Sequence, residues 1–346
     1  MSSQKLFNVA VVGATGAVGE QIIRLLESRN FPIHELTLLS SERSAGTKLT
    51  FKGNEVTVKA ATPDSFEGID IALFSAGGSV SQELIPHAVR HGAVCIDNTS
   101  AFRMDPETPL VVPEVNIDKI NEHKGVIANP NCSTIQMVAA LKPLYDRYGI
   151  SRIIVSTYQA VSGAGARAID EMLRQSKEIL AGHTVEPQIL PVGALPVKHQ
   201  IAFNAIPQID KFTDNGFTYE EMKMINETKK IMDDDSLEVT ATCVRIPVVY
   251  GHSESVYVEL KQDFDVEEVK QLLADAPGIV LLDNPAEQQY PLATDAAGKL
   301  DTFVGRVRRD LSNPRGLNMW IVSDNLLKGA AWNAVQIAEY IAIEQE

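Results

Sequence analysis

A glycine-rich turn near the N-terminus constrains the fold of this chain more than any other feature. The residues before it, Phe7–Val12, are almost continuously apolar and β-branched, which is typical of a buried strand. The residues after it, Val18–Leu26, have the apolar spacing of a helix. Between them Gly13, Gly16 and Gly19 form a GxxGxxG pattern. Such glycines let the backbone approach a pyrophosphate at the helix N-terminus, although a tight strand-to-helix turn without a ligand gives the same pattern.

The first part of the chain goes on alternating between strand and helix patterns. Four further strands and one helix are predicted, at Leu36–Leu39, Ile69–Phe74, Val94–Ile96 and Val126–Ala128 for the strands and Val80–His91 for the helix. Alternation of this kind is typical of a doubly wound parallel sheet. We therefore predict an α/β fold that begins with a Rossmann-type domain.

The pattern changes after residue 131. Helices and strands no longer alternate strictly, which indicates a second, α+β unit with a mixed or antiparallel sheet. The predicted helices are Thr134–Tyr148, Ala164–Leu180, Tyr219–Met232, Val266–Ala274 and Asp324–Glu344, and the predicted strands are Ile153–Tyr158, Val239–Val249, Ser255–Leu260 and Thr302–Val307. Asp324 is the expected N-cap of the last helix. Val185–Phe212 contains several prolines and no clear period, and we expect a partner subunit to order this excursion.

Composition excludes several classes of function. The chain has 346 residues, enough for about two domains. Its net charge of −14 argues against binding to nucleic acid or to an anionic membrane, although a small anionic substrate needs only a few local cations. We find no apolar run of the roughly 20 residues that span a bilayer, and no signal peptide. Three cysteines make a disulfide framework unexpected, so we expect a cytoplasmic protein; we expect no metal.

Cys132 is the residue with the clearest sign of chemistry. It follows Asn129-Pro130-Asn131 and precedes an apolar helix pattern, so it is predicted at a helix N-terminus. Backbone N–H groups and the helix dipole favour a thiolate at such a place, whereas a buried cysteine acts as a small hydrophobe. Cys95 and Cys243 lie in apolar strand patterns and are expected to do only the latter.

A thiolate nucleophile needs a partner that moves protons, and His252 is the candidate. It follows Gly251 and precedes polar residues, which predicts a turn at a strand end rather than a core position. The other six histidines lie in predicted helices or loops without such a setting. A lone histidine is more often structural than catalytic, so both interpretations of His252 stay open at this point.

Two arginines are candidates for binding an anion. Arg103 follows a predicted strand end. Arg245 is the only charged residue in a predicted buried strand, so it should meet either a protein carboxylate or a carboxylate of the substrate.

Two further pairs of charged residues are less specific. Glu220 and Lys223 share one face of a predicted helix, where a solvated surface pair is the ordinary alternative. Arg306 and Arg308 share a face of a predicted strand, and we assign them no role.

The end of the second predicted strand bears on the cofactor. An NAD site usually presents an acidic side chain there, but this chain has Ser40, Ser41, Glu42, Arg43 and Ser44. The serines and Arg43 suit the 2′-phosphate of NADP. Glu42 could instead bind a ribose or face water, and Arg43 could be a solvated loop charge.

Together these motifs make the chain resemble aspartate-semialdehyde dehydrogenases along nearly its whole length. The matching segments are Val11–Gly19, Asn129–Thr134, Tyr158–Gly165, Glu220–Lys223, Glu227–Ile231, Arg245–Val248 and Gly251–Ser253. The cysteine motif is highly specific, and the glycine turn is much less so.

The resemblance implies a reaction, an assembly and a division into domains. The reaction would be reversible, NADP-dependent reductive dephosphorylation of L-aspartyl-4-phosphate to L-aspartate 4-semialdehyde and inorganic phosphate, through a cysteine thioester. It belongs to lysine, threonine, methionine and diaminopimelate biosynthesis. The assembly would be a homodimer. Residues 1–131 with a returning C-terminal helix at 324–346 would form the NADP-binding domain, and residues 132–323 the catalytic and dimerisation domain.

The resemblance also implies roles for individual residues. Cys132 would be the nucleophile, His252 the acid/base group, and Gln159 the residue that orients the bound acyl group. Arg245 would bind the substrate carboxylate and Glu220 its amino group, with Glu221 as the neighbouring alternative. Arg103 and Lys223 would bind the phosphate of the substrate, and Asn131 would be a further substrate-binding residue. The cofactor would be held by Gly13, Thr15, Gly16, Ala17, Val18, Gly19, Ser40, Arg43, Ser44, Ser75, Ala76, Gly77, Ser162, Gly163 and Asn325.

Three rival functions remain to be separated by experiment. N-acetyl-glutamyl-phosphate reductases share the fold and the chemistry, but commonly have glycine where Asn131 stands. A Cys–His hydrolase would not need the nucleotide turn. A non-catalytic dinucleotide sensor would bind NADP without a reactive thiol.

Overall fold

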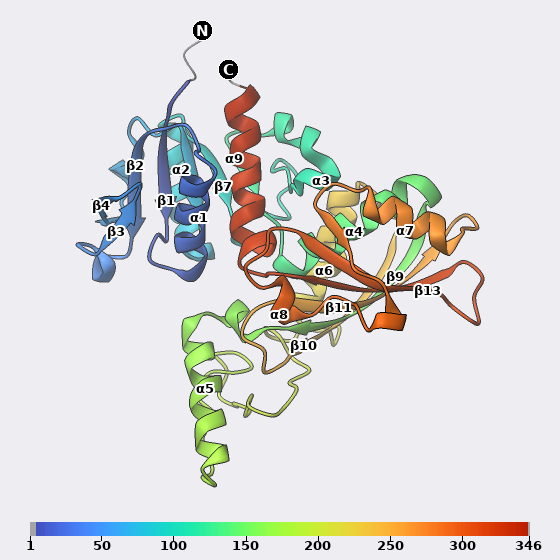
Figure 1. Cartoon of the computed structure of the whole chain (residues 1–346). Helices are drawn as coiled ribbons and strands as arrows, with labels where there is room; N and C mark the ends of the chain where they lie inside the picture. Colours follow the sequence, from blue (N-terminus) through green and yellow to red (C-terminus); the bar gives the residue numbers. More distant parts are fainter. Residues whose placement is uncertain (1–4, 345–346) are drawn as a thin grey trace. The chain divides into compact units, whose positions relative to one another are not determined.

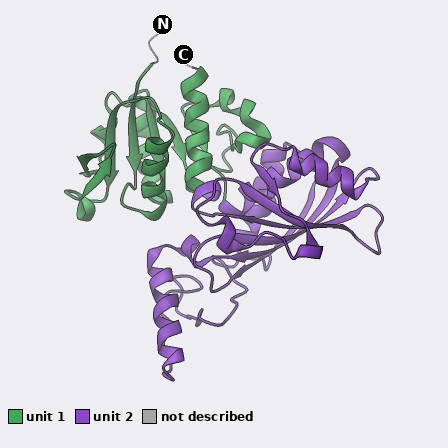
Figure 2. Ribbon diagram, viewed as in Figure 1, with its two compact units in different colours: residues 1–131, 330–346 green, residues 132–329 purple. Residues whose placement is uncertain are grey.

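The chain folds into two units in the computed structural model, which describes residues 5–344 (Figure 2). Unit 1 consists of the residues up to Asn131 together with those from Ala330 onward, and unit 2 of Cys132–Gly329. The C-terminal return therefore starts at Ala330 rather than at residue 324. The Asp324 carboxylate accepts the N–H groups of Leu326, Leu327 and Gly298, which keeps this stretch within unit 2. None of the helices in residues 5–344 is long and apolar enough to cross a membrane.

Unit 1 is built on a six-stranded parallel sheet in the order β5-β2-β1-β6-β7-β8 (Figure 1). Its strands are β1 (Phe7–Val12), β2 (Ile33–Ser40), β5 (Lys59–Ala60), β6 (Ile71–Phe74), β7 (Val94–Asp97) and β8 (Val126–Ala128). Because both faces are covered, β1 and β6 are almost entirely buried, as their apolar runs predict. The doubly wound parallel fold predicted for this half is confirmed.

Helices and one hairpin complete unit 1. The helices are α1 (Ala17–Ser28), α2 (Gly78–Arg90), α3 (Pro113–Asn116) and α9 (Trp332–Glu344), and the hairpin pairs β3 (Lys48–Phe51) with β4 (Asn54–Thr57). Helix α9 packs beside α1 (Figure 1). Asn333 of α9 also donates to the carbonyl of Val111 and to the side chain of Asn129, which ties the C-terminal helix to the end of the sheet.

Unit 2 contains a mixed six-stranded sheet in the order β10-β9-β11-β14-β13-β12. The strands are β9 (Ile150–Gln159), β10 (Glu238–Arg245), β11 (His252–Leu260), β12 (Ile279–Leu281), β13 (Thr302–Arg309) and β14 (Gly316–Ser323). The outer pairs β10–β9 and β12–β13 are parallel, and the inner pairs are antiparallel. The α+β character predicted for this half is confirmed.

One face of this sheet is covered by helices. Helix α4 (Cys132–Tyr148) packs on β11, β14 and β9, with α6 (Tyr219–Met232) and α7 (Val266–Ala274) beside it. Helix α6 begins with a capping box formed by Thr218 and Glu221, and α7 with the Asp265 carboxylate, so local sequence defines both starts. The remaining helices are α5 (Ala166–Leu180) and the short α8 (Ala293–Ala296).

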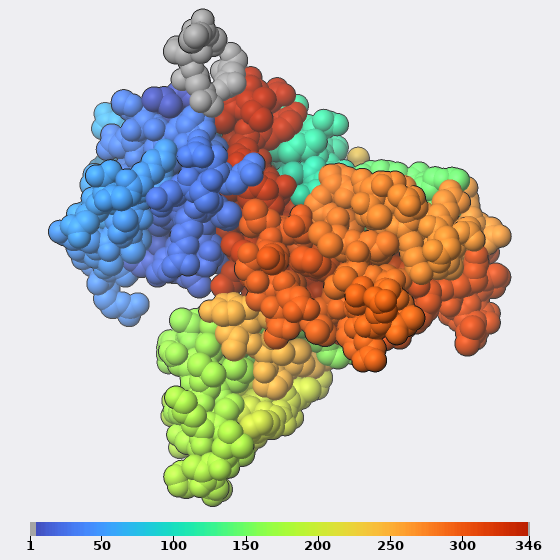
Figure 3. Space-filling view, in the orientation of Figure 1, coloured from blue at the N-terminus to red at the C-terminus, as the bar shows by residue number. Residues whose placement is uncertain are grey.

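The proline-rich excursion packs on its own chain. Helix α5 and the following excursion lie together in the green to yellow-green lobe of unit 2 in Figure 3. Met172 of α5 shares a small apolar core with Leu190, Ile201 and Ile206. The Gln175 side chain of the same helix accepts the backbone N–H groups of Ile201 and Ala202. These contacts hold the excursion against its own chain, and ordering by a partner subunit stays a prediction.

Several sequence predictions differ from the structure, which also has the short strands β3, β4, β5 and β12 that were not predicted. The predicted strand Val239–Val249 ends at Arg245, because Pro247 cannot donate to a ladder. Strand β14 is missing from the prediction. The predicted helix over 324–344 is interrupted: Asp324 caps a π-helical turn at Leu327–Ala331, and regular α-helix begins only at Trp332.

Candidate active site

Neighbouring strands of unit 2 bring three of the predicted residues into one row. Arg245, the last residue of β10, pairs with Gln159, the last residue of β9. The pairing of Ser253 with Tyr158 places His252, the first residue of β11, on the other side of Gln159. All three side chains are buried. Residues far apart in the sequence therefore meet at the ends of these three strands, on the face of the sheet that α4 covers.

Cys132 is the first residue of α4, as the sequence predicts. It is partly exposed, whereas Cys95 and Cys243 are buried and their burial raises the pKa of both thiols. The Cys132 sulfur is close enough to Arg245 that a thiolate there would stabilise the positive guanidinium. Of the three cysteines, Cys132 alone has both the exposure and the nearby cation that a reactive thiolate needs.

His252 does not occupy the exposed turn that the sequence predicts. It belongs to β11 and is fully buried, because the strand starts one residue after Gly251 and its first side chain faces the helix layer. Burial, and secondarily the positive charge of Arg245, lowers the pKa of His252 to about 3. The imidazole is therefore neutral at physiological pH.

The hydrogen bond at one ring nitrogen identifies the tautomer of His252. The backbone N–H of Ala160 donates to Nδ1 at 3.1 Å, so Nδ1 must be unprotonated and the proton of the neutral ring lies on Nε2. Nε2 has no hydrogen-bond partner among residues 5–344. The ring thus offers one buried N–H donor to a substrate oxygen.

Arg245 is anchored beside this ring. Its Nη1 donates to the carbonyl of Ala160 at 2.7 Å. Burial lowers the pKa of the guanidinium, and the negative charge of Glu220 opposes that effect. The sequence left open whether Arg245 meets a protein or a substrate carboxylate. The structure supplies Glu220 as a nearby protein carboxylate, and the five-donor guanidinium retains the geometry to bind a second one.

Glu220 and Lys223 lie on α6 and belong to a buried polar network, not to a solvated surface pair. Glu220 is buried and accepts from Gln159 Nε2 and from Lys223 Nζ, both at 3.2 Å. Lys223 Nζ also bonds Asp210 at 3.2 Å. The adjacent Glu221 has a different task, because its carboxylate accepts the backbone N–H groups of Thr218 and Cys243. Glu220, not Glu221, is the acid that faces the site.

Ser162, Gly163 and Asn325 lie next to this cluster. Ser162 and Asn325 hydrogen-bond each other through their side chains, and Asn325 Oδ1 also accepts the N–H of Gly251, directly before His252. A Cβ on Gly163 would stand 3.0 Å from Arg245 Nη1 and 3.4 Å from His252 Nε2. A side chain at 163 would thus press on the guanidinium, which would have to shift by a few tenths of an ångström.

The predicted nucleotide turn belongs to unit 1. Gly13 has φ +86°, and a Cβ there would stand 2.8 Å from the Ser75 backbone, while a Cβ on Gly19 would stand 2.2 Å from the Gly13 carbonyl. Helix α1 starts after Gly16 and α2 after Gly77, and neither start is capped by a side chain. Two adjoining strand ends thus present helix N-termini without side-chain caps, which suits a pyrophosphate.

The end of β2 adjoins this turn. Thr15 Oγ1 and Ser40 Oγ are hydrogen-bonded at 2.9 Å. A single 3-10 turn at Glu42–Ser44 follows, and Arg43 is exposed on it. Ser40, Arg43 and Ser44 therefore lie at the strand end that contacts the adenosine ribose of a dinucleotide in folds of this kind.

Arg103 and Asn131 are also residues of unit 1. Arg103 is buried, and its guanidinium donates to the backbone carbonyls of Asn129 and Asn98 at 2.9 and 2.8 Å. These bonds hold the guanidinium in one orientation against Asn129, the first residue of the cysteine motif. Asn131 is buried and directly precedes Cys132.

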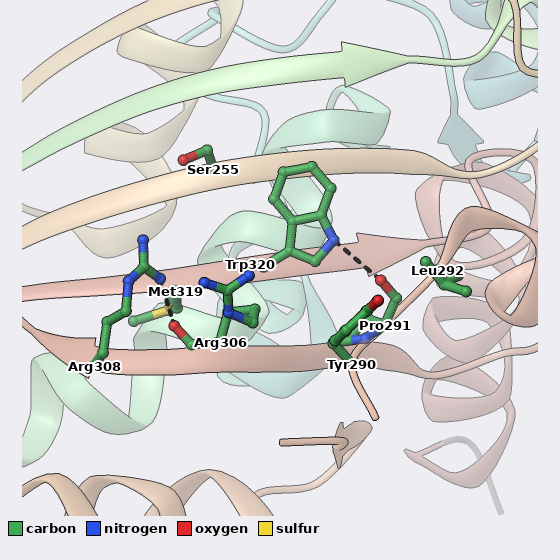
Figure 4. A pocket seen from close by; sticks show the side chains of 8 residues that line it. All are labelled: Ser255, Tyr290, Pro291, Leu292, Arg306, Arg308, Met319 and Trp320. Atoms are coloured by element: carbon green, nitrogen blue, oxygen red, sulfur yellow. Dashed lines mark hydrogen bonds between the residues drawn. The ribbon is translucent and has the colours of Figure 1, made fainter. Parts of the chain in front are cut away.

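A cavity of about 380 Å³ lies on the other face of the unit 2 sheet (Figure 4). Ser255 of β11 and Trp320 of β14 form part of its lining, and both alternate with the inward-facing residues of their strands. Arg306 and Arg308 line it as well, and Trp320 Nε1 donates to the Pro291 carbonyl. No predicted catalytic residue lines this cavity.

Sequence reasoning missed four residues of the site. The backbone of Ala160 contacts both His252 and Arg245, and Gly329 packs on Cys132. Gln136, on the same helix as Cys132, and Glu254, on the same strand as His252, are buried polar side chains. The spacing of Gln136 four residues after Cys132, and of Glu254 two residues after His252, was the available signal for these two.

Two family models match the chain. "Semialdehyde dehydrogenase, NAD binding domain" matches residues 8–123, and "Semialdehyde dehydrogenase, dimerisation domain" matches residues 141–328. Among curated relatives, the aspartate-semialdehyde dehydrogenase of Bacillus subtilis is 64% identical and that of Aquifex aeolicus 55%, covering 96% and 98% of both chains respectively.

Solved structures agree with these matches. The Vibrio cholerae aspartate semialdehyde dehydrogenase II complexed with ASA is 51% identical, with a TM-score of 0.92 over 97% of this chain and 98% of that one. The Candida albicans enzyme with NADP is 25% identical, with a TM-score of 0.74 over 97% and 98% of the two chains.

Proposed function

Because the chain belongs to the aspartate-semialdehyde dehydrogenase family, we propose that it converts L-aspartyl-4-phosphate reversibly to L-aspartate 4-semialdehyde and phosphate with NADP. The chain is an oxidoreductase of amino-acid biosynthesis with a domain for a nicotinamide cofactor. The observation that carries the proposal is the placement of Cys132 at the start of α4, beside Arg245 and on the face that holds His252 and Gln159.

Acylation requires a nucleophile and a leaving group. The Cys132 sulfur attacks the acyl carbon, the bond from that carbon to the phosphate oxygen breaks, and a thioester forms. The sulfur reacts as the thiolate and the released phosphate takes one proton from solvent, so the step is balanced and the thiolate expelled in the reduction starts the next turnover. Backbone N–H groups in the first turn of α4 would stabilise the developing oxyanion, Lys223 and Arg103 would each bind the phosphate, and Asn131 would be a further substrate-binding residue.

Reduction of the thioester needs one oxyanion donor and no net proton. When bound, the nicotinamide cofactor supplies the hydride that this reduction consumes. The Nε2–H of His252 hydrogen-bonds the resulting oxyanion, which then collapses and expels the Cys132 thiolate. We place the role expected of His252 at Nε2, because Nδ1 already accepts the N–H of Ala160; in this step the ring acts as a hydrogen-bond donor and keeps its proton. Gln159, held by Glu220, orients the acyl oxygen.

Charge complementarity supports the choice of substrate. Aspartyl phosphate carries an α-carboxylate and an ammonium group besides the phosphate. Arg245 would bind the carboxylate, and the buried Glu220 would bind the ammonium group. A buried acid at this place also separates the proposal from N-acetylated substrates, which have no cation to offer Glu220.

The glycine turn of unit 1 fits the cofactor. Its crowded backbone and the helix starts without side-chain caps would hold the pyrophosphate, through the turn Gly13–Gly19 and the strand end Ser75–Gly77. Ser40, Ser44 and Arg43 would bind the 2′-phosphate, and this supports NADP over NAD. Ser162, Gly163 and Asn325 would line the nicotinamide side. We further propose a cytoplasmic homodimer, which the match to a dimerisation-domain model supports.

A spectrophotometric assay tests the proposed function. Purified protein is mixed with aspartate semialdehyde, phosphate and NADP, and formation of NADPH is followed; the assay is repeated with NAD and with N-acetylglutamate semialdehyde. We expect phosphate-dependent reduction of NADP with aspartate semialdehyde. The Cys132→Ser variant should lose turnover and keep its affinity for NADP, while the control Cys95→Ala, in the other unit, should stay active. Ester cleavage without NADP, or NADP binding without turnover, would instead support the hydrolase or the sensor.

A further inference from the structure

Glu254 on β11 is a buried acid that the proposed chemistry leaves unused. Its side chain is fully buried, and neither carboxyl oxygen has a hydrogen-bond partner among residues 5–344. Burial raises the pKa of this carboxyl well above its usual value, so the group is protonated at neutral pH. A protonated carboxyl offers one O–H donor.

Within residues 5–344, no cation acts on the carboxyl of Glu254. Thr157 of β9 and Ile321 of β14 lie directly opposite it in the sheet. Cys243 of β10 is the next residue of that row, and burial keeps its thiol protonated. From the helix layer, the Gln136 amide of α4 is the polar group that acts on the carboxyl; it lowers the pKa of Glu254, but by less than burial raises it. Glu254 therefore has the Gln136 amide as its polar neighbour, and no counter-ion among the described residues.

Gln136 links Glu254 to the reactive residues. It is fully buried and lies one helical turn after Cys132. Its Nε2 donates to the backbone carbonyl of His252 at 3.3 Å, while its Oε1 has no partner among the described residues. An orphaned acceptor on Gln136 thus adjoins an orphaned acid on Glu254, and His252 is two residues from that acid on the same face of β11.

We propose that Glu254, as a neutral carboxylic acid, donates a hydrogen bond to Gln136 Oε1 and so acts as a positioning residue for Cys132 and His252. The bond completes a tie between α4 and β11: Glu254 to Gln136, and Gln136 to the backbone of His252. The start of α4 carries the sulfur and the start of β11 carries the imidazole, so this tie sets the separation of Cys132 Sγ from His252 Nε2.

Packing alone does not account for this pair. Apolar side chains of similar volume would fill the space without burying polar atoms that lack partners. An ionised Glu254 would cost still more free energy to bury, because no positive group among the described residues acts on it. Burial of both polar groups is explained if Glu254 and Gln136 form a hydrogen bond with each other. Both side chains are fully buried, so the inference, which rests on the proposed function, predicts an effect on the chemical step and not on binding.

Two substitutions of Glu254 separate the roles of donor, charge and volume. Glu254→Gln keeps the shape and an N–H donor, and it should hold kcat within about 3-fold of the wild type. Glu254→Met keeps the volume and removes the donor; it should lower kcat by about 10- to 100-fold, the loss expected from slight misplacement of reacting groups, with KM for semialdehyde and NADP nearly unchanged. Val258→Ala, on the same buried face of β11, controls for lost packing and should lower stability without lowering kcat.

Three outcomes would overturn the proposal. Wild-type kcat in Glu254→Met would show that the donor is not needed. Equal inactivity of Glu254→Gln and Glu254→Met would show that the acid itself moves a proton. A parallel loss of kcat in Val258→Ala would reduce the effect to packing.

A spectroscopic test does not depend on turnover or on folding of the methionine variant. The infrared difference spectrum between wild type and Glu254→Gln at pH 7.5 should contain a protonated carboxylic-acid carbonyl band, and a carboxylate band in its place would refute the neutral acid. Absence of dehydrogenase activity in the wild type would overturn the proposed function, yet it would leave this band unchanged.

Discussion

Gly329 packs directly on the catalytic candidate Cys132. A Cβ at position 329 would stand 3.3 Å from the Cys132 Cα and 2.8 Å from its Cβ, and the second distance is shorter than non-bonded carbon atoms normally approach. Gly329 belongs to the π-helical turn Leu327–Ala331, and its N–H bonds the carbonyl of Asp324. The π-helical turn thus packs against Cys132 and helps to fix the position of its side chain.

We expect Gly329→Ala to lower kcat by about 10- to 100-fold, because the added methyl group must displace Cys132. The overpacked site should also cost about 1–3 kcal/mol in the free energy of unfolding. Steady-state kinetics and urea unfolding measure the two effects. Gly193→Ala is the matched control, since a Cβ at residue 193 meets nothing within 4 Å. Unchanged kinetics in Gly329→Ala would contradict a close fit at Cys132.

The two neighbouring acids of α6 should respond differently to substitution. Glu220→Gln removes the negative charge between Gln159 and Lys223, so kcat/KM for aspartate semialdehyde should fall by about 10- to 100-fold, the value of a hydrogen bond to a charged group. Glu221→Ala removes the capping box, so the free energy of unfolding should fall by about 1–2 kcal/mol. The opposite pattern would assign the substrate amine to Glu221.

The buried His252 makes stability depend on pH. Its pKa is about 3 in the folded chain and 6.5 for the ordinary side chain, so the unfolded state binds more protons between these values. The free energy of unfolding should therefore fall as pH drops below 6.5, by about 1.4 kcal/mol per pH unit for this one group. Urea unfolding at pH 7 and pH 5 should show a smaller loss for His252→Gln than for wild type. The exposed His91→Gln should match wild type, and equal losses in all three proteins would show that His252 titrates normally.

Selectivity for NADP should depend on Arg43. Replacing Arg43 with serine should raise the KM for NADP by about 10- to 100-fold and change the KM for NAD much less, because only the 2′-phosphate accepts charge-assisted bonds from it. Initial rates with both cofactors measure this ratio. Lys48→Ser, which removes another exposed cation of unit 1 that pairs with Glu55, should leave the ratio unchanged. An equal loss for NAD would remove the argument for a phosphate contact.

Local sequence predicted much of this fold because short-range physics decides it. The apolar run and the glycines define β1, the turn and α1. Helix α6 agrees with its prediction at both ends, since Thr218 and Glu221 form a capping box within four residues of chain. Cys132 was placed correctly at a helix start for the same reason.

Tertiary structure alone decided what surrounds the sulfur. The row of Arg245, Gln159 and His252 exists because β10, β9 and β11 pair in one register, and pairing across about 90 residues leaves no local signal. That register buries His252, which the sequence predicted in a turn, and brings Glu254 beneath Gln136. The sequence by itself determined which residues could react and where chain segments begin. Only long-range strand pairing determined which of them meet, and how burial changes their protonation.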